Sequence, residues 1–161
     1  MNRSLYSGES EITSLTMAIL PRKTENGGIG SHILESEAEY FLEESPSKVI
    51  DTACKFFGQS LAGLQNGTKE VINMSHKLPI SIDVWSGMYF IPTLSATNPK
   101  CAWINHTHIE SVERVGKKQT KVNFNEELSA MVEVSYGSLM NQINRTAQFR
   151  FILDKRIKGL R

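Results

Sequence analysis

The chain has 161 residues, of which 40% are hydrophobic and 22% are charged, and its formal net charge is +1. This length suits one domain that buries roughly 70% of its unfolded surface, and the composition excludes a wholly disordered chain. No apolar run approaches the roughly 18 residues of a membrane span, and Glu9 and Glu11 interrupt the apolar core that a signal peptide needs, so a cytoplasmic protein is expected.

Charge is distributed unevenly along the chain. Residues 1–50 carry four Lys or Arg and eight Glu, a balance of −4. Residues 51–161 carry fourteen Lys or Arg and nine acids, a balance of +5. A polyanion such as nucleic acid would therefore meet the second part, although the solvated faces of an ordinary protein can have the same composition.

The acidic part predicts short strands. Residues 1–12 are polar and are expected to form a flexible arm, followed by a single domain over residues 13–161. Alternating apolar residues predict a strand over residues 14–20 that ends at Pro21, and Asn-Gly-Gly places a turn within residues 23–31.

A hairpin and a helix are predicted next. Residues 31–35 and 39–44 are expected to pair, and an amphipathic helix follows over residues 46–57, with Ser45 as its N-cap and Gly58 as its left-handed end. Apolar residues at three- and four-residue spacings predict the buried face of this helix: Val49, Ile50, Ala53, Phe56 and Phe57. Cys54 is expected to be packed and unreactive, and both cysteines to be reduced.

The middle of the chain combines an ambiguous segment with a clear hairpin. Residues 59–67 fit a loop or a short helical turn, and residues 68–75 fit neither the strand nor the helix period. Residues 80–84 and 88–91 predict a hairpin around Ser86-Gly87. After it, the loop over residues 93–100 carries hydrogen-bond donors, one cation and no carboxylate, so it would suit an anion.

The last part predicts three more strands and a helix. The strands are expected over residues 109–115, 121–124 and 128–134, and the C-terminal helix over residues 138–155. The expected fold is therefore α+β, an antiparallel sheet of several hairpins with a central amphipathic helix and a C-terminal helix packed on it.

The C-terminal helix has apolar residues beyond a single stripe. Its main stripe contains Leu139, Ile143, Ala147 and Phe151. Phe149, Ile152 and Leu153 lie off this stripe, so they need cover from their own domain or from another subunit. These three residues are the expected oligomerisation site.

Enzymatic motifs are absent from the sequence. It has no Gly-x-Ser-x-Gly elbow, P-loop, dinucleotide fingerprint or His-Glu-x-x-His, so no catalytic residue and no enzyme activity are expected. His106 and His108 would share one face of a strand near Cys101, but a closed set of four ligands is missing, so neither a metal nor another cofactor is expected. Hydrogen bonding to phosphate or to the loop backbone is favoured over metal binding, and a purely structural role is the commonest outcome for such a pair. Trp103 is expected in the core.

Several separated segments resemble one known family. VIDTACKFFGQSLAG, SHKLPI, FIPTLSATNP and CAWINHTHI follow one another between residues 49 and 109, and LTMAILP precedes them. In this order they resemble the ComK family, the competence transcription factors of Gram-positive bacteria. The resemblance implies a DNA-binding activator of competence genes that binds AT-rich sites through the minor groove as an oligomer. It also implies contacts with RNA polymerase and with a proteolytic adaptor that recognises a tail of longer family members.

Nine residues inside the matching segments are expected to contact DNA, because they are cationic or carry hydrogen-bond donors: Lys55, Lys69, His76, Lys77, Asn98, Lys100, Asn105, His106 and His108. The alternative is a protein-interaction module that uses the apolar end of the C-terminal helix without binding DNA. A salt series on a DNA mobility shift separates the two.

Overall fold

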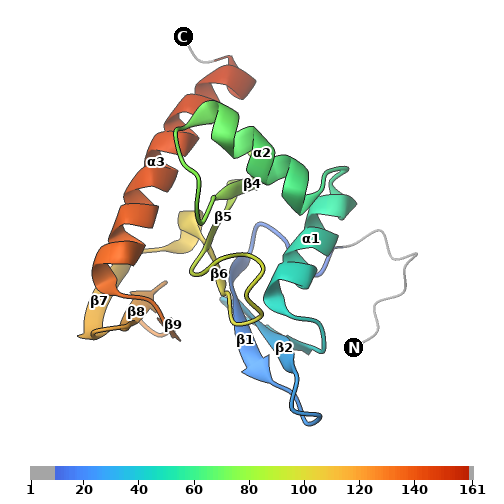
Figure 1. Ribbon diagram of the computed structural model, residues 1–161, viewed down its shortest axis with the longest axis vertical. Coiled ribbons are helices and arrows are strands. Elements are labelled where there is room, and N and C mark those ends of the chain that lie inside the picture. The colour runs from blue at the N-terminus through green and yellow to red at the C-terminus, as the bar shows by residue number, and fades with distance from the viewer. Residues whose placement is uncertain (1–9, 160–161) are drawn as a thin grey trace.

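The computed structural model describes residues 10–159. Most of the predicted arm, residues 1–9, lies outside the described residues, whereas Ile12 is 1% exposed and packs in the core. The expected α+β fold is confirmed: within the described residues the strands form two antiparallel sheets, and three α-helices pack around them (Figure 1).

The larger sheet has six strands. In spatial order they are β3 (Glu39–Leu42), β2 (Ile29–Glu35), β1 (Thr16–Lys23), β6 (Trp103–Asn105), β5 (Met88–Pro92) and β4 (Ile80–Asp83). Every neighbouring pair is antiparallel, and the predicted β2–β3 and β4–β5 hairpins are confirmed. β1 continues through Pro21, where the sequence predicted its end. β6 pairs with β1 only at Ala18 and Ile19. Pro21 therefore lies beyond this pairing, where one side of β1 has no neighbouring strand and a missing N–H breaks no hydrogen bond on that side.

The smaller sheet has three strands in chain order, β7 (Ser111–Gly116), β8 (Gln119–Asn123) and β9 (Ser129–Val132), which confirms the three predicted strands. Between β6 and β7 a short 3₁₀ helix, η1 (His106–His108), replaces the strand continuation that the sequence predicted. His106 and His108 therefore do not share a strand face.

The two faces of the large sheet have separate cores because successive residues of a strand point in opposite directions. Ile19, Ile33 and Trp103 face helix α1 (Pro46–Phe56), whereas Ala18 and Ile104 face the small sheet and the start of helix α3 (Tyr136–Lys158). Trp103 is fully buried, as predicted from its apolar neighbours. Complete burial of such a side chain contributes about 3 kcal/mol to folding.

Helix α1 confirms the prediction for its central residues and contradicts it at its end. Val49, Ile50 and Ala53 are buried, but Phe56 and Phe57 are 49% and 38% exposed. The helix ends at Phe56, and Gly58 turns the chain with a φ of +79°. The sheet therefore does not cover the rings of Phe56 and Phe57, which pack edge-to-face on each other. Ser45 is the N-cap residue without a side-chain capping bond.

The ambiguous segment forms a full helix, α2 (Leu61–Val71), despite two glycines within it. Ser60 caps it by accepting a hydrogen bond from the Gly63 N–H at 3.0 Å. Thr68 fixes its second half, because the buried hydroxyl donates to the Pro79 carbonyl at 2.6 Å. Tertiary contacts therefore stabilise this helix, because its local helix propensity is too weak to do so alone.

Helix α3 is longer than predicted, and its buried face differs. Phe149 is 2% exposed and packs against Tyr89 with ring centroids 5.9 Å apart, whereas Phe151, assigned to the buried stripe, is 62% exposed. Ile152 and Leu153 pack partly against the same cluster as Phe149. The chain itself therefore covers much of the predicted oligomerisation site. Between residues 10 and 159, no helix is long and apolar enough to cross a membrane.

Candidate nucleic-acid interface

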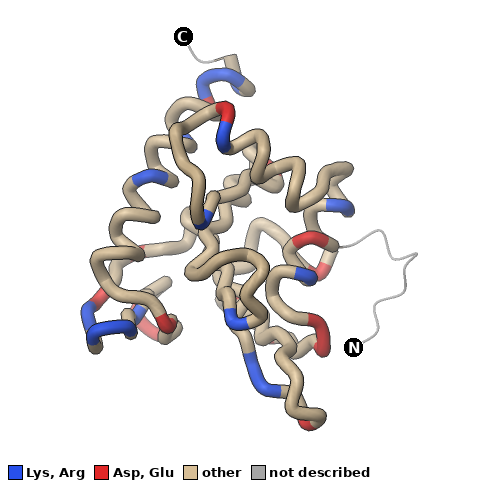
Figure 2. The backbone as a smooth tube through the Cα atoms, viewed as in Figure 1, with Lys and Arg blue, Asp and Glu red and all other residues tan. Residues whose placement is uncertain are grey.

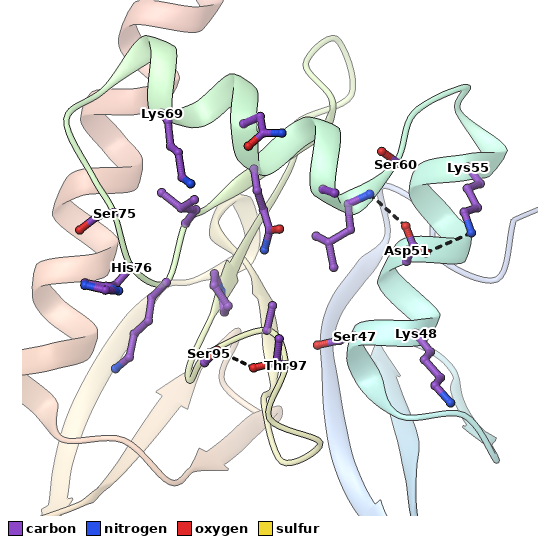
Figure 3. A pocket seen from close by; sticks show the side chains of 18 residues that line it. Ser47, Lys48, Asp51, Lys55, Ser60, Lys69, Ser75, His76, Ser95 and Thr97 are labelled. Carbon is purple, nitrogen blue, oxygen red and sulfur yellow. Dashed lines mark hydrogen bonds and ion pairs between the residues drawn. The ribbon is translucent and has the colours of Figure 1, made fainter.

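A pocket of about 960 Å³ lies between α1, α2, the segment that leads from α2 to β4, and the loop after β5 (Figure 3). Each of these segments contributes to the lining, and helices α1 and α2 each supply lysines. The cationic residues of this pocket are Lys48, Lys55, Lys69 and Lys77, with His76 beside them. We call it the α1–α2 pocket.

The α1 wall of the pocket contains three charged residues on one face of the helix. Lys48, Asp51 and Lys55 are spaced three and four residues apart, which places them on neighbouring turns. Asp51 Oδ1 accepts a hydrogen bond from the Leu61 N–H at 2.9 Å, and its other oxygen lies 3.2 Å from Lys55 Nζ. Because Leu61 is the first residue of α2, this carboxylate joins the two helices.

Asp51 is the one carboxylate among the described residues that line the pocket. The Leu61 N–H lowers the pKa of this carboxyl most strongly; partial burial opposes the change, and Lys55 adds to the lowering. The carboxylate is therefore ionised at neutral pH and partly neutralised by its partners, so the lysines still dominate the pocket.

Neutral polar side chains line the rest of the pocket. Gln65 and Asn66 come from α2, and Ser95 and Thr97 come from the loop after β5, where their hydroxyls lie 3.0 Å apart. Ser47 accepts a hydrogen bond from Trp103 Nε1 at 3.1 Å, which ties the α1 wall to the core. Amide and hydroxyl donors beside lysines are the groups that proteins use on nucleic-acid backbones and base edges.

The structure brings four of the nine predicted contact residues together. Lys55, Lys69, His76 and Lys77 all line the α1–α2 pocket, although they come from three different segments. Figure 3 shows three of these side chains, labelled Lys55, Lys69 and His76, around the pocket. The four residues form one surface that the sequence did not place together.

Asn98 and Lys100 lie on the exposed loop next to this surface, outside the pocket lining. Asn98 Oδ1 accepts a hydrogen bond from the Lys100 N–H at 2.9 Å, so the Asn98 side chain also shapes its own turn. Contact of these two residues with DNA stays a prediction.

The other three predicted contacts are engaged inside the protein. Asn105 is fully buried and donates to the Thr16 carbonyl at 3.0 Å, so the prediction that it contacts DNA is wrong for this fold. His108 Nε2 donates a hydrogen bond to the Ser14 carbonyl at 2.7 Å. These two side chains therefore satisfy backbone carbonyls at and just before the start of β1.

His106 belongs to a group of polar side chains that we call the closed network: His106, Thr107, Arg150, Tyr89 and Asp154. Arg150 donates to His106 Nδ1 at 3.0 Å and to Thr107 Oγ1 at 2.9 Å, and its guanidinium carbon lies 4.5 Å from the centre of the Tyr89 ring. The Tyr89 hydroxyl donates to Asp154 at 2.7 Å. The network fastens α3 to β5 and η1.

The bonds of His106 fix its protonation state. Nδ1 accepts from Arg150, so the ring proton is on Nε2, which donates to the Ile143 carbonyl at 3.2 Å. Burial, followed by the charge of Arg150, lowers the pKa of His106 to about 4. Both nitrogens of His106 are engaged within the protein in this structure, and contact of His106 with DNA stays a prediction.

Comparison with known proteins agrees with the resemblance seen in the sequence. Residues 8–158 match the ComK protein family. The chain belongs to the ComK family. The competence transcription factor of Bacillus subtilis (strain 168) is 37% identical to it over 147 residues, which cover 91% of this chain and 76% of that relative. No solved structure matches the chain. The whole α1–α2 pocket lies within the segment that matches the ComK family.

In this ComK-family chain the pocket also contains residues that sequence reasoning missed. Lys48 is seven residues before Lys55, two helical turns, so helix periodicity alone would have placed both on one face. Gln65 and Asn66 gave no such signal, because their orientation depends on α2, a helix that the sequence left undecided.

Other basic residues of the chain lie elsewhere. Lys117 and Lys118 form the turn between β7 and β8, and Figure 2 shows basic segments both there and along the helices. The charge balance of residues 51–161 therefore overstates the charge of the pocket itself, and contacts have to be assigned by position.

The cysteines of the chain offer no reactive thiol. Cys54 and Cys101 are both fully buried and unpaired. Burial, with a smaller contribution from Asp51, raises the pKa of Cys54 to about 12, and burial also raises the pKa of Cys101. Within residues 10–159 no three or more His, Cys, Asp and Glu side chains gather as metal ligands.

Proposed function

We propose that this chain is a DNA-binding transcriptional activator of competence genes that acts in the cytoplasm. The observation that carries the proposal is the α1–α2 pocket, where Lys48, Lys55, Lys69 and Lys77 converge from separate segments around one open surface. Family membership and the name of the Bacillus subtilis relative, a competence transcription factor, support the biological role.

The electrostatics of the pocket favour phosphate as the ligand. Four lysines oppose the single carboxylate of Asp51, which is already engaged by Leu61 and Lys55. Lys48, Lys55 and Lys69 are exposed at the surface, so a polyanion can reach them without rearrangement of the chain. Neutralisation of phosphates by such residues releases counterions and supplies most of the affinity for any duplex.

The neutral part of the lining supports a preference for AT-rich DNA. The side-chain amides of Gln65 and Asn66 can donate to A N3 and T O2, the acceptors of the minor groove. When the amide nitrogens face the groove floor, the amino group of G is a second donor in their path, so G·C pairs are disfavoured in this orientation. Binding through the minor groove is therefore part of the proposal, and sequence-dependent groove width would add to the selection.

Assembly on DNA as a dimer or higher oligomer is also part of the proposal. One pocket with four lysines engages few phosphates, and a second copy on the same duplex doubles that number. Sedimentation of the free protein and of its complex with an AT-rich duplex measures the number of copies, and one copy on every duplex length contradicts this part.

The test is a mobility shift with an AT-rich and a GC-rich duplex of equal length in a salt series. If four phosphates are engaged, log Kd against log salt has a slope magnitude of about 3.6, so affinity falls roughly a hundredfold between about 50 and 200 mM salt. A flat salt response contradicts DNA binding and favours the protein-interaction alternative. Equal affinity for both duplexes contradicts the AT preference alone.

A further inference from the structure

Residues 75–77, which we call the ridge, separate the α1–α2 pocket from a second, smaller one. The smaller pocket measures about 260 Å³ and shares all three ridge residues, Ser75, His76 and Lys77, with its neighbour. Its other wall is helix α3, through residues such as Ser138, Gln142 and Arg145. The ridge is therefore a part of the candidate interface that also borders α3.

The backbone of the ridge is strained. Among residues 10–159, Lys77 is the one residue other than glycine with a positive φ, at +50°. This left-handed conformation brings Cβ too close to the backbone, and lysine has no short polar side chain to compensate. A conformation of this kind persists only where surrounding contacts enforce it.

Helix α3 supplies those contacts. Gln142, a side chain only 5% exposed, donates from Nε2 to the Lys77 carbonyl at 2.7 Å and approaches the Pro92 carbonyl at 3.4 Å. Arg145 donates to the Asn73 carbonyl at 3.2 Å, and Lys77 Nζ donates to Ser138 Oγ at 3.2 Å. The shortest of these bonds is on the strained residue itself.

The geometry points to Gln142 as a positioning residue for DNA contact, which holds the ridge so that His76 and Lys77 line the α1–α2 pocket. This inference rests on the proposed function, because it explains the strained backbone at Lys77 by a role in DNA binding. Gln142 lines the smaller pocket and not the α1–α2 pocket, so it acts through the Lys77 backbone. A glycine at position 77 would adopt the same backbone at lower cost, whereas the chain places a lysine at this position.

The first test is Gln142→Met, which keeps the length and the net charge but removes the donor. With all lysines present, a released ridge is expected to weaken binding to the AT-rich duplex about tenfold and to reduce the salt slope by about one, the loss of one phosphate contact. Thr146→Val is the matched control, since Thr146 is fully buried in α3 and its hydroxyl bonds only within the helix, to the Gln142 carbonyl at 2.7 Å. It is expected to lower the melting temperature without changing affinity or salt slope.

The second test compares Lys77→Gly with Lys77→Ala, which remove the same charge. If the ridge is strained, the glycine variant melts about 2–4 °C higher than the alanine variant, the shift of a modest stabilisation in a chain of this size. If the alanine variant melts at the same temperature as the glycine variant, the backbone at position 77 is not strained and this part of the inference is wrong. If Gln142→Met does not fold, Gln142→Asn serves instead, because its amide is one methylene short of the Lys77 carbonyl.

The outcomes separate the inference from the function on which it rests. A wild-type chain that binds no duplex overturns both. A wild-type chain that binds, together with a folded Gln142→Met variant that has unchanged affinity and salt slope, overturns the inference and leaves the function standing. Equal losses of affinity in Gln142→Met and Thr146→Val also overturn it, because general destabilisation would then explain the result.

Discussion

The α1–α2 pocket and the closed network contain the same kinds of side chain but differ in what satisfies them. In the pocket, Lys48 and Lys69 are exposed and form none of the described ion pairs. In the closed network, Arg150 and His106 bond to each other, and the second nitrogen of His106 is engaged by the Ile143 carbonyl. Residue type alone therefore does not identify a binding surface. Hydrogen-bonding capacity that the fold leaves free distinguishes the two regions.

Removal of two pocket lysines tests one side of this comparison and has the largest expected effect. Lys48→Ala combined with Lys69→Ala should weaken binding to any duplex about a hundredfold near 0.1 M salt and reduce the salt slope by about two, because each lysine accounts for one phosphate. The melting temperature should be unchanged, since both side chains are exposed.

The matched control for this pair is Lys117→Ala with Lys118→Ala, which removes the same charge from the β7–β8 turn. This control should change affinity by less than about threefold, a long-range effect that salt screens. Equal losses in the two double variants would show that overall charge, and not the pocket, governs binding.

Disruption of the closed network tests the other side. Arg150→Met should lower the free energy of unfolding by about 2 kcal/mol, because it leaves Nδ1 of the partly buried His106 without its donor and removes the contact with the Tyr89 ring. Denaturant unfolding measures this change, and DNA affinity of the folded variant should remain that of wild type.

Arg114→Met is the control, because Arg114 also lies over an aromatic ring, at 4.8 Å from the centre of Tyr136, but is exposed. It should cost about 0.5 kcal/mol. If Arg150→Met weakens DNA binding as strongly as the loss of a pocket lysine, the division between the two regions is wrong.

The pH dependence of stability gives a third contrast. The folded state lowers the pKa of His106 to about 4 from an ordinary value of 6.5, so the unfolded chain binds more protons between these values. This contribution to stability is complete above pH 6.5 and is lost as the pH falls towards 4. Denaturant unfolding at several pH values should show the decline, and His106→Gln should flatten it. An equal decline in His106→Gln would assign it to other groups.

Addition of a cation to the pocket has the smallest expected effect. Gln65→Lys places a fifth lysine on the lining and should tighten duplex binding about fivefold to tenfold, with a salt slope about one unit steeper. The loss of the Gln65 amide should also reduce the preference for AT-rich DNA. Unchanged affinity would mean that DNA does not reach the α2 wall, and the same mobility shift measures both effects.

The sequence predicted most of the fold because its signals were local. Pro46 and Gly58 marked α1, and the Ser86-Gly87 turn marked the β4–β5 hairpin, because proline restricts its own φ and glycine adopts the positive φ of a turn without strain. Helix α2 escaped prediction because Gly63 and Gly67 weaken its propensity and its support comes from tertiary bonds. Such support cannot be read from periodicity.

The candidate site was only partly predictable for the same reason. Lys55 and Lys69 were selected by charge, and a long basic side chain on a helix is exposed in most folds. Asn105 and His106 were selected by the same reasoning, but whether a polar group bonds inside the protein depends on partners distant in sequence, such as Thr16 and Ile143. The hydrogen-bond partners of a polar side chain can therefore be assigned only once the fold is known.

The carboxylate of Asp51 has a kinetic consequence. It holds α2 against α1 through the Leu61 N–H at 2.9 Å and keeps one negative charge among four lysines. An asparagine could accept the same bond without the charge, so the contact between the two helices does not require an acid. On the proposed function, the charge shortens the residence time on every duplex alike by weakening the part of the affinity that is independent of sequence. A protein that dissociates sooner from nonspecific sites searches a chromosome faster. Asp51 would therefore favour a faster search over a higher affinity.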